Sequence, residues 1–316
     1  MALFMGEFSK YVGEVGEEIV DDFLRLFGWK NMCSNKELSC CISTHKKKTH
    51  GIDALFLYPS PLQKQSLVSV VVSAKYSSNP YSNIKTTFKS HFTDIAHTVD
   101  CYSKSQLKRS LTKAFKGSSR KDDIGVLFYL NNDESGDKDN IKSYIANSRL
   151  DSSLKFSVIH VIDNARADFL YSSLSFIKSK YSLLEFFCNG TTLKVGTSKS
   201  HSRVMPVEYI TSPIIPVSIM TEGGRKLVLL CDFDFSKESL ELVYKLARKL
   251  CAEFTNHYEV YFKTYSKLRD APVVDEVKMS AQAEGLNCED DYYDMENFPE
   301  PTLIVGTYNQ TFRNDF

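Results

Sequence analysis

The sequence predicts an α/β protein with two domains, residues 1–182 and 183–316. An amphipathic helix near the start precedes two apolar runs that are joined by a proline-containing turn, which is typical of a helix followed by paired strands. Strand-like and helix-like segments then alternate up to residue 180. From about residue 183 the pattern changes to short strands around glycine-containing turns, which indicates a second, α+β domain.

Length and composition support a large globular core. The chain has 316 residues, of which 42% are hydrophobic and 25% charged, as in ordinary globular domains. No apolar run has the length of a membrane span, and the opening MALFMGEFSKY shows neither a basic leader nor a small-residue cleavage site. We therefore expect a cytoplasmic protein that does not enter the membrane.

The charge is balanced over the chain but not along it. Lysine and arginine total 39, and so do aspartate and glutamate, which argues against a simple nucleic-acid coat. Residues 85–121 nevertheless hold nine basic residues and two acidic ones. Such a basic region favours contact with phosphate groups.

The first element is a helix over residues 11–27. Its apolar residues recur at helical spacing and form one stripe, and Gly28 provides a stop signal; the stripe consists of Val12, Val15, Ile19, Phe23 and Leu26. Glu17 lies at the shoulder of this stripe rather than on the polar side. An acid at that place is either solvated and favoured by the helix dipole or directed at a ligand.

The central elements are two strands, Ile52 to Tyr58 and Leu67 to Lys75, which we expect to pair antiparallel. Because side chains alternate along a strand, Ser73 and Lys75 share one face. Asp53, near the start of the first strand, then comes beside Lys75. A carboxylate and an ammonium on neighbouring strands suit metal-assisted phosphodiester hydrolysis, in which the acid binds a divalent cation and the lysine stabilises charge or activates water.

These residues resemble the motif of the PD-(D/E)xK nuclease superfamily, in which an Asp opens one strand and an acid-x-Lys triplet ends the next. Asp53 and the triplet Ser73-Ala74-Lys75 take these places, with Ser73 standing where an acid is usual. The resemblance implies Mg²⁺ or Mn²⁺ as cofactor. It also implies that Glu17, in the segment Gly13-Glu14-Val15-Gly16-Glu17, is a second metal ligand on the first helix.

The remaining elements of the first domain follow from periodicity and turn residues. The resemblance implies a restriction-endonuclease-like αβββαβ core, and the order of these elements agrees with it. The predicted elements are a strand at 37–43, a helical stretch at 84–116 broken near Ser103, a strand at 124–130, a helix at 140–149, a strand at 156–162 and a helix at 165–180.

Five lysines are candidates for DNA contact. Lys46, Lys47 and Lys48 form a polar loop just before Asp53, while Lys85 and Lys89 follow the second motif strand. Lysines so close to the proposed site suit binding of the phosphate backbone. The alternative for the loop is an ordinary solvated turn.

The sequence argues against a zinc site. The eight cysteines contain no CxxC pair, which favours reduced thiols. Cys33, Cys40, Cys41, His45 and His50 lie near one another in the chain, but their spacing matches no compact finger pattern. We also expect Cys40 and Cys41 to lie within a strand and therefore to point to opposite faces.

The C-terminal domain is predicted from two hairpin signals and one strong helix. The signals are Asn189-Gly190 and Gly223-Gly224, and the helix spans residues 236–254 with Ser236 as its N-cap. A Ser- and Thr-rich stretch at 197–203 is interpreted as a connector. Further strands are expected at 258–262 and 302–305.

The segments GEFSKYVGEVGEEIV, THGIDALF and SAKYSSNPY resemble the nuclease subunit of bacterial anti-phage defence systems. This resemblance implies a metal-dependent DNA endonuclease that works with a second protein subunit, for which the C-terminal domain is a candidate docking or regulatory surface. A homodimer is also expected, since many relatives pair two active sites. The alternative is a catalytically weak or inactive DNA-binding scaffold, in which Lys75 contacts phosphate and Asp53 is its ion-pair partner. Cleavage of RNA would use the same site chemistry.

Overall fold

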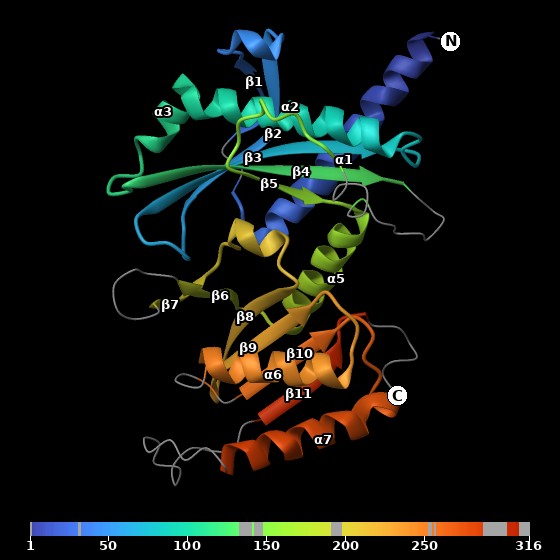
Figure 1. Ribbon diagram of the computed structural model, residues 1–316, viewed down its shortest axis with the longest axis vertical. Helices are drawn as coiled ribbons and strands as arrows, with labels where there is room; N and C mark the ends of the chain where they lie inside the picture. The colour runs from blue at the N-terminus through green and yellow to red at the C-terminus, as the bar shows by residue number, and fades with distance from the viewer. Residues whose placement is uncertain are drawn as a thin grey trace. The chain divides into compact units, whose positions relative to one another are not determined.

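The computed structural model describes residues 2–30, 33–132, 141, 148–190, 198–251, 255, 257–286 and 302–309 (Figure 1). The chain divides into two compact units, each built around its own β-sheet. The first unit comprises residues 1–171 and 205–211, and the second comprises residues 172–204 and 212–316. Among the described residues, no helix combines the length and the apolar character needed to span a bilayer.

The first unit contains a five-stranded sheet in the order β1-β2-β3-β4-β5. β1 to β3 pair antiparallel, and β3, β4 and β5 pair parallel. The strands and helices follow the predicted order, α-β-β-β-α-β, with α3 directly after α2; their bounds are α1 (Ala2–Phe27), β1 (Cys33–Ser39), β2 (Thr49–Pro59), β3 (Ser66–Ser77), α2 (Ile84–Lys104), α3 (Gln106–Thr112), β4 (Arg120–Asn131), β5 (Val158–Ile162) and α5 (Asn164–Lys180). This order confirms the predicted αβββαβ core.

Helices α1 and α2 cover opposite faces of this sheet. The face toward α2 is apolar at alternate positions of β3, so that Leu67 and Val71 pack with Phe88 of the helix. On the other face, Phe23 of α1 packs against Phe128 of β4, with ring centroids 5.5 Å apart. The Val- and Ile-rich central strands are buried between these two layers, as a parallel sheet requires.

Helix α1 ends where the sequence predicts. Gly28 has a φ of 70°, and its N–H donates to Arg25 O at 3.1 Å while Trp29 N–H donates to Leu24 O at 2.9 Å. This pair of bonds is a Schellman motif, for which glycine is favoured because it adopts positive φ at low cost. The helical stretch after β3 is interrupted at Ser105, whose side chain caps α3 by accepting from Lys108 N–H.

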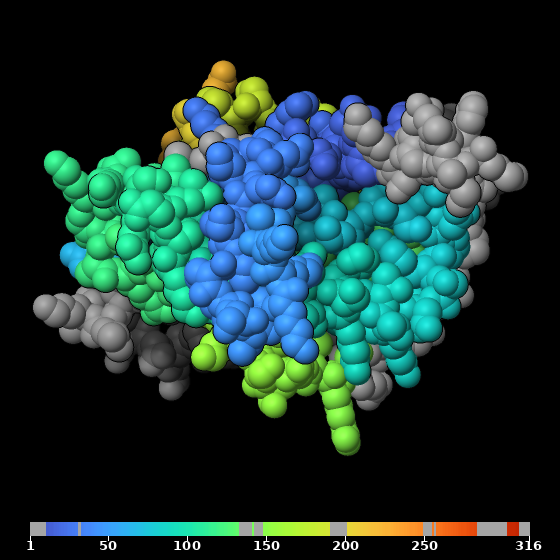
Figure 2. All heavy atoms as spheres, turned by 90° about the horizontal axis from the view of Figure 1, so that it is seen from above, coloured from blue at the N-terminus to red at the C-terminus, as the bar shows by residue number. Residues whose placement is uncertain are grey.

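The segment between β1 and β2 differs from the prediction. The strand expected at 37–43 ends at Ser39, so Cys40 and Cys41 lie outside it, and a short 3₁₀ helix, η1 (Ser43–His45), follows. The apolar run Cys40-Cys41-Ile42 predicts a longer strand, but pairing with β2 stops at Ser39↔Thr49. β1 and η1 lie across helix α2 (Figures 1 and 2). Most of the helix predicted at 140–149 lies outside the described residues.

The second unit contains a six-stranded mixed sheet in the order β11-β10-β9-β8-β6-β7. Its elements are β6 (Leu184–Gly190), β7 (Ser198–Ser202), β8 (Ile214–Thr221), β9 (Gly224–Cys231), α6 (Lys237–Cys251), β10 (His257–Phe262), α7 (Lys267–Leu286) and β11 (Thr302–Thr307), while η2 (Val207–Ile210) belongs to the first unit. The hairpin around Gly223 is confirmed by the pair Thr221↔Gly224. Ser236 caps α6 as predicted, because its side chain accepts from Ser239 N–H at 3.1 Å.

Two predictions for this unit are wrong. Asn189 and Gly190 do not form a turn, because they continue β6 and pair with Lys199 and Ser198. The stretch interpreted as a connector therefore contains strand β7. Helix α7 was not predicted at all.

A buried carboxylate connects the sheet of the second unit to the end of α5. Glu259 is 2% exposed and accepts from Tyr261 at 2.7 Å and from Tyr181 at 2.8 Å. Its ion-pair partners are Lys180 at 3.1 Å and Lys226 at 3.3 Å. Burial by itself raises the pKa of Glu259, but these hydrogen bonds and the Lys180 ammonium outweigh it, so the pKa lies below its ordinary value.

Candidate active site

Asp53 lies where strands β2 and β3 separate. The paired residues end at Ala54↔Val72, and beyond this point the Asp53 side chain continues the contact. Its Oδ2 accepts from the Ala74 N–H at 2.6 Å. The Asp53 carboxylate thus takes the place of a backbone carbonyl as hydrogen-bond acceptor, at the point where the two strands separate. The structure therefore brings Asp53 directly to the Ser73-Ala74-Lys75 triplet.

Ser73 and Lys75 stand on one face of β3, the face that packs with α2. Ser73 is 8% exposed, and Lys75 is half-buried near the end of the strand. Among the described residues, no ion pair joins Lys75 to Asp53, although both border Ala74. The arrangement that the scaffold interpretation requires, with Asp53 as the salt-bridge partner of Lys75, is not formed in this structure.

The surroundings of Lys75 are aromatic. Lys75 pairs with Tyr129 of the parallel strand β4, and Tyr81 stacks on Tyr129 with ring centroids 4.3 Å apart. His91 of α2 is close to both tyrosines. Burial lowers the pKa of His91, and the positive charge of Lys75 lowers it further. His91 is therefore a neutral imidazole at neutral pH, beside the ammonium group.

Glu17, on helix α1, lies beside the strand position that carries Asp53. Its Oε2 accepts from the side-chain amide of Asn35 at 2.9 Å. Asn35 stands between the pairs Ser34↔Ala54 and Lys36↔Ile52, so it is opposite Asp53 in the β1–β2 ladder. Asn35 has a φ of 48°, a left-handed conformation that asparagine tolerates. Glu17 is thus held at the strand pair that carries Asp53 and is half-buried there.

A close approach of α1 to β3 fixes the place of Glu17. A Cβ added at Gly16 would lie 2.6 Å from Tyr76 Cβ, so the helix backbone contacts the strand next to Lys75. Gly13, in contrast, has open space around its Cα. The Gly-x-x-Gly-Glu segment therefore uses its second glycine to bring Glu17 to the sheet.

The candidate DNA-binding lysines are exposed but not equivalent. Lys46, Lys47 and Lys48 follow η1, and Lys47 forms an ion pair with Asp94 of α2. That pair places the loop on α2, the helix that also carries Lys85 and Lys89 one turn apart. The two groups of lysines therefore adjoin the same helix on the first unit.

Several residues around the site were not identified from the sequence. Asn35, His91 and Tyr129 belong to three different elements, and none has a spacing that connects it to Asp53 or Lys75. The hydroxyl of Tyr129 is buried and has no hydrogen-bond partner among the described residues. Burial raises the pKa of Tyr129, and the neighbouring Tyr81 raises it further, so both hydroxyls stay protonated beside Lys75.

Together, the described side chains provide two carboxylates and one ammonium near the point where the pairing of β2 and β3 ends. Carboxylates of this kind bind divalent cations through oxygen, and an adjacent lysine stabilises developing negative charge.

The model of one protein family, described as the GAPS4 protein PD-(D/E)XK nuclease domain, matches residues 5–166. The match extends from α1 through β5 and includes every residue of the candidate site. No curated protein and no solved structure matches the chain.

Proposed function

The chain belongs to the GAPS4 family of PD-(D/E)XK nucleases, a family of anti-phage defence nucleases, and on this premise we propose that it is a metal-dependent DNA endonuclease. Membership confirms the resemblance inferred from the sequence. The observation that carries the proposal is the contact of Asp53 with the Ala74 amide, since it joins the two halves of the motif at one point.

PD-(D/E)XK nucleases generally use divalent metals, and the donor set here suits one. Mg²⁺ is commonly held by one or two carboxylates, with water and substrate phosphate completing an octahedral shell. Asp53 and Glu17 are the carboxylates that would hold it, and Ser73 would contribute at most a weak or water-mediated contact. A bound Mg²⁺ or Mn²⁺ would polarise the scissile phosphate and lower the pKa of a bound water.

Lys75 supplies the positive charge of the site. With no carboxylate partner among the described residues, its ammonium remains available to a phosphate oxygen or to the attacking water. The neutral His91 adds no competing positive charge. Lys75 would therefore stabilise the charge that develops at phosphorus or orient the nucleophile.

DNA would lie against helix α2 and the loop before β2. Lys46, Lys48, Lys85 and Lys89 are exposed there, and Lys47 fixes the loop to the helix through Asp94. Contacts from such lysines are to phosphates and carry no sequence information.

A second candidate function rests on Ser73. The motif has a hydroxyl where an acid is usual, so the site has one carboxylate fewer than a complete motif supplies. The chain would then be a nuclease-like DNA-binding subunit of a defence complex, with little or no cleavage of its own. In either case we expect a second protein subunit, and we propose the second unit as its docking surface.

Cleavage of plasmid DNA with Mg²⁺ or Mn²⁺ tests the proposal, with and without the partner subunit. Asp53→Asn keeps an oxygen that can accept from Ala74 N–H but removes the charge, and Lys75→Ala removes the ammonium. The matched controls, Asp122→Asn and Lys64→Ala, lie toward the opposite end of β3, where Asp122 contacts Ser66.

We expect a loss of at least about 100-fold in the two site variants and wild-type cleavage in both controls. DNA binding without cleavage by the wild type, in the complex and with either metal, would favour the scaffold function. Cleavage that survives Lys75→Ala would refute the assignment of the site.

A further inference from the structure

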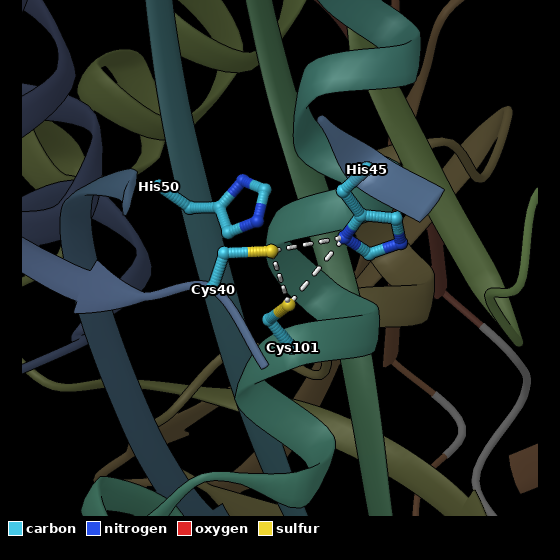
Figure 3. A group of neighbouring side chains, drawn as sticks. All are labelled: Cys40, His45, His50 and Cys101. Carbon is cyan, nitrogen blue, oxygen red and sulfur yellow. Dashed lines mark hydrogen bonds between the residues drawn. The ribbon is translucent and has the colours of Figure 1, made fainter. Parts of the chain in front are cut away.

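Three side chains from the segment around η1 converge with a fourth, distant in the sequence, on helix α2 (Figure 3). Cys40 follows β1, His45 ends η1, His50 lies in β2 and Cys101 lies in α2. One ligand atom from each lies within 4.8 Å of the ligand atoms of the other three. The end of β1, η1 and the start of β2 are thus brought against a residue of α2 that lies fifty residues further along the chain.

The separations agree with the edges of a metal tetrahedron. Zinc bonds of about 2.3 Å to sulfur and about 2.0–2.1 Å to nitrogen place tetrahedral ligand atoms about 3.8 Å apart for two sulfurs and about 3.6 Å apart for sulfur and nitrogen. Cys40 Sγ and Cys101 Sγ are 3.7 Å apart. His45 Nδ1 is 3.7 Å from the first sulfur and 3.4 Å from the second.

His50 provides an independent observation. Its side chain is 2% exposed, and neither ring nitrogen has a hydrogen-bond partner among the described residues. A buried imidazole without partners is costly, because at least one N–H and one lone pair lose their contacts with water. Figure 3 shows the ring beside Cys40 Sγ, where one of its nitrogens faces the cluster.

A carboxylate lies behind His45, as is usual for metal-binding histidines. Nε2 of His45 is 3.6 Å from Oδ2 of Asp100, and Lys104 holds the other oxygen of that carboxylate at 2.6 Å. A proton on Nε2, oriented by the carboxylate, leaves the lone pair of Nδ1 directed at the two sulfurs. Asp100 is therefore a positioning residue for His45.

We propose that Cys40, His45, His50 and Cys101 form a Cys₂His₂ site for a structural Zn²⁺ ion. Two sulfurs and two imidazole nitrogens in a tetrahedron select zinc over magnesium or calcium, which prefer oxygen ligands. All four positions are filled by protein, so no coordination place is left for substrate, and the site is structural rather than catalytic. Binding of zinc releases the two thiol protons to solvent.

The ion would fix the segment of residues 40–50 to helix α2. This segment has little regular structure apart from η1, and its lysines face solvent. His50 precedes Asp53 by three residues in β2, so the same ion would also hold the start of the strand that carries the candidate active site. This last consequence rests on the proposed function, whereas the zinc site itself does not.

Metal content of the full-length protein tests the proposal without reference to nuclease activity. The protein is produced without a metal-affinity tag, passed over a desalting column, and analysed by inductively coupled plasma mass spectrometry. We expect one zinc per chain in the wild type and in Cys33→Ser, the control that changes a free cysteine of β1 outside the cluster. Cys40→Ser, His50→Ala and Cys101→Ser should each lose most of the zinc.

A second measurement uses only the wild type, so it does not depend on the folding of any variant. Replacement of zinc by Co²⁺ should produce the thiolate charge-transfer band and the strong visible absorption of a tetrahedral Co²⁺ site. Wild-type protein that contains no zinc and gives no such spectrum would overturn the proposal, as would a disulfide between Cys40 and Cys101 in mass spectra of the freshly prepared chain. Zinc retained in full by Cys101→Ser and His50→Ala would overturn the assignment of the ligands.

Discussion

Replacing Gly16 by alanine tests how closely helix α1 must approach strand β3. The added Cβ would lie 2.6 Å from Tyr76 Cβ, whereas two carbons at optimal separation are about 3.5–4.0 Å apart. The helix and the strand must therefore separate by about 1 Å. Tyr76 cannot relieve the contact by changing its rotamer, because a Cβ atom does not move with the side-chain torsions.

The expected magnitude follows from two opposing effects. Overpacking of this kind costs about 1–3 kcal/mol, while alanine in place of glycine inside a helix returns about 1 kcal/mol. The matched variant is Gly13→Ala, for which no atom lies within 4 Å of the new Cβ, so only the favourable effect remains. The two variants should differ in unfolding free energy by about 1–3 kcal/mol, with Gly16→Ala the less stable.

Denaturant unfolding followed by Trp29 fluorescence is the appropriate assay. Trp29 is the only tryptophan of the chain and is buried in the first unit against Phe56, with ring centroids 5.6 Å apart. Because Glu17 follows Gly16 directly, a shift of about 1 Å should also reduce DNA cleavage by roughly 100-fold. A Gly16→Ala protein that unfolds at the same denaturant concentration as Gly13→Ala, or a higher one, would refute the close approach of α1 to β3.

Two further predictions concern charge. Glu259→Gln should destabilise the second unit by about 2–3 kcal/mol at pH 7, less than a fully buried ion pair because Lys180 and Lys226 regain solvent. Since the pKa of Glu259 is lowered in the folded chain, its contribution is complete above the unfolded pKa and is lost as pH falls through the folded one. Thermal unfolding from pH 7 to pH 3 should therefore show the difference between wild type and variant shrinking; a constant difference would exclude the charged network. Lys85→Gln combined with Lys89→Gln should make the fall of log affinity for DNA with log salt concentration less steep, by about 2 in slope. An unchanged slope would mean that DNA lies elsewhere.

Strands β2, β3 and β4 could be predicted because their Val-, Ile- and Leu-rich runs match a fully buried sheet. The edge strand β7 could not, since Ser198–Ser202 acquires its structure from pairing with β6 rather than from its own residues. The same limit applies to the sites. Asp53 and Lys75 were identified through a short motif. The contact of Glu17 with Asn35 depends on the packing of α1 against the sheet, which no local sequence pattern predicts.

The argument against zinc assumed a geometry that the structure does not have, for two reasons. Cys40 was assigned to a strand, in which it would have pointed away from Cys41, but β1 ends one residue earlier. The fourth member of the cluster, Cys101, lies beyond β3 and most of α2, so a search for compact spacing could not include it. A cluster of this kind is visible only after the fold has brought the helix back over the hairpin.

Ser73 changes what the rest of the candidate site must supply. A hydroxyl contributes no charge to a divalent cation, so a second carboxylate has to come from outside the β2–β3 pair. Helix α1 can supply it, because Gly16 allows a close approach to Tyr76 and Glu17 is bound by Asn35, which lies opposite Asp53. The two carboxylates therefore belong to separate elements whose spacing depends on helix packing. A change that loosens α1, or that releases the start of β2 near His50, would separate them without altering any residue of the motif.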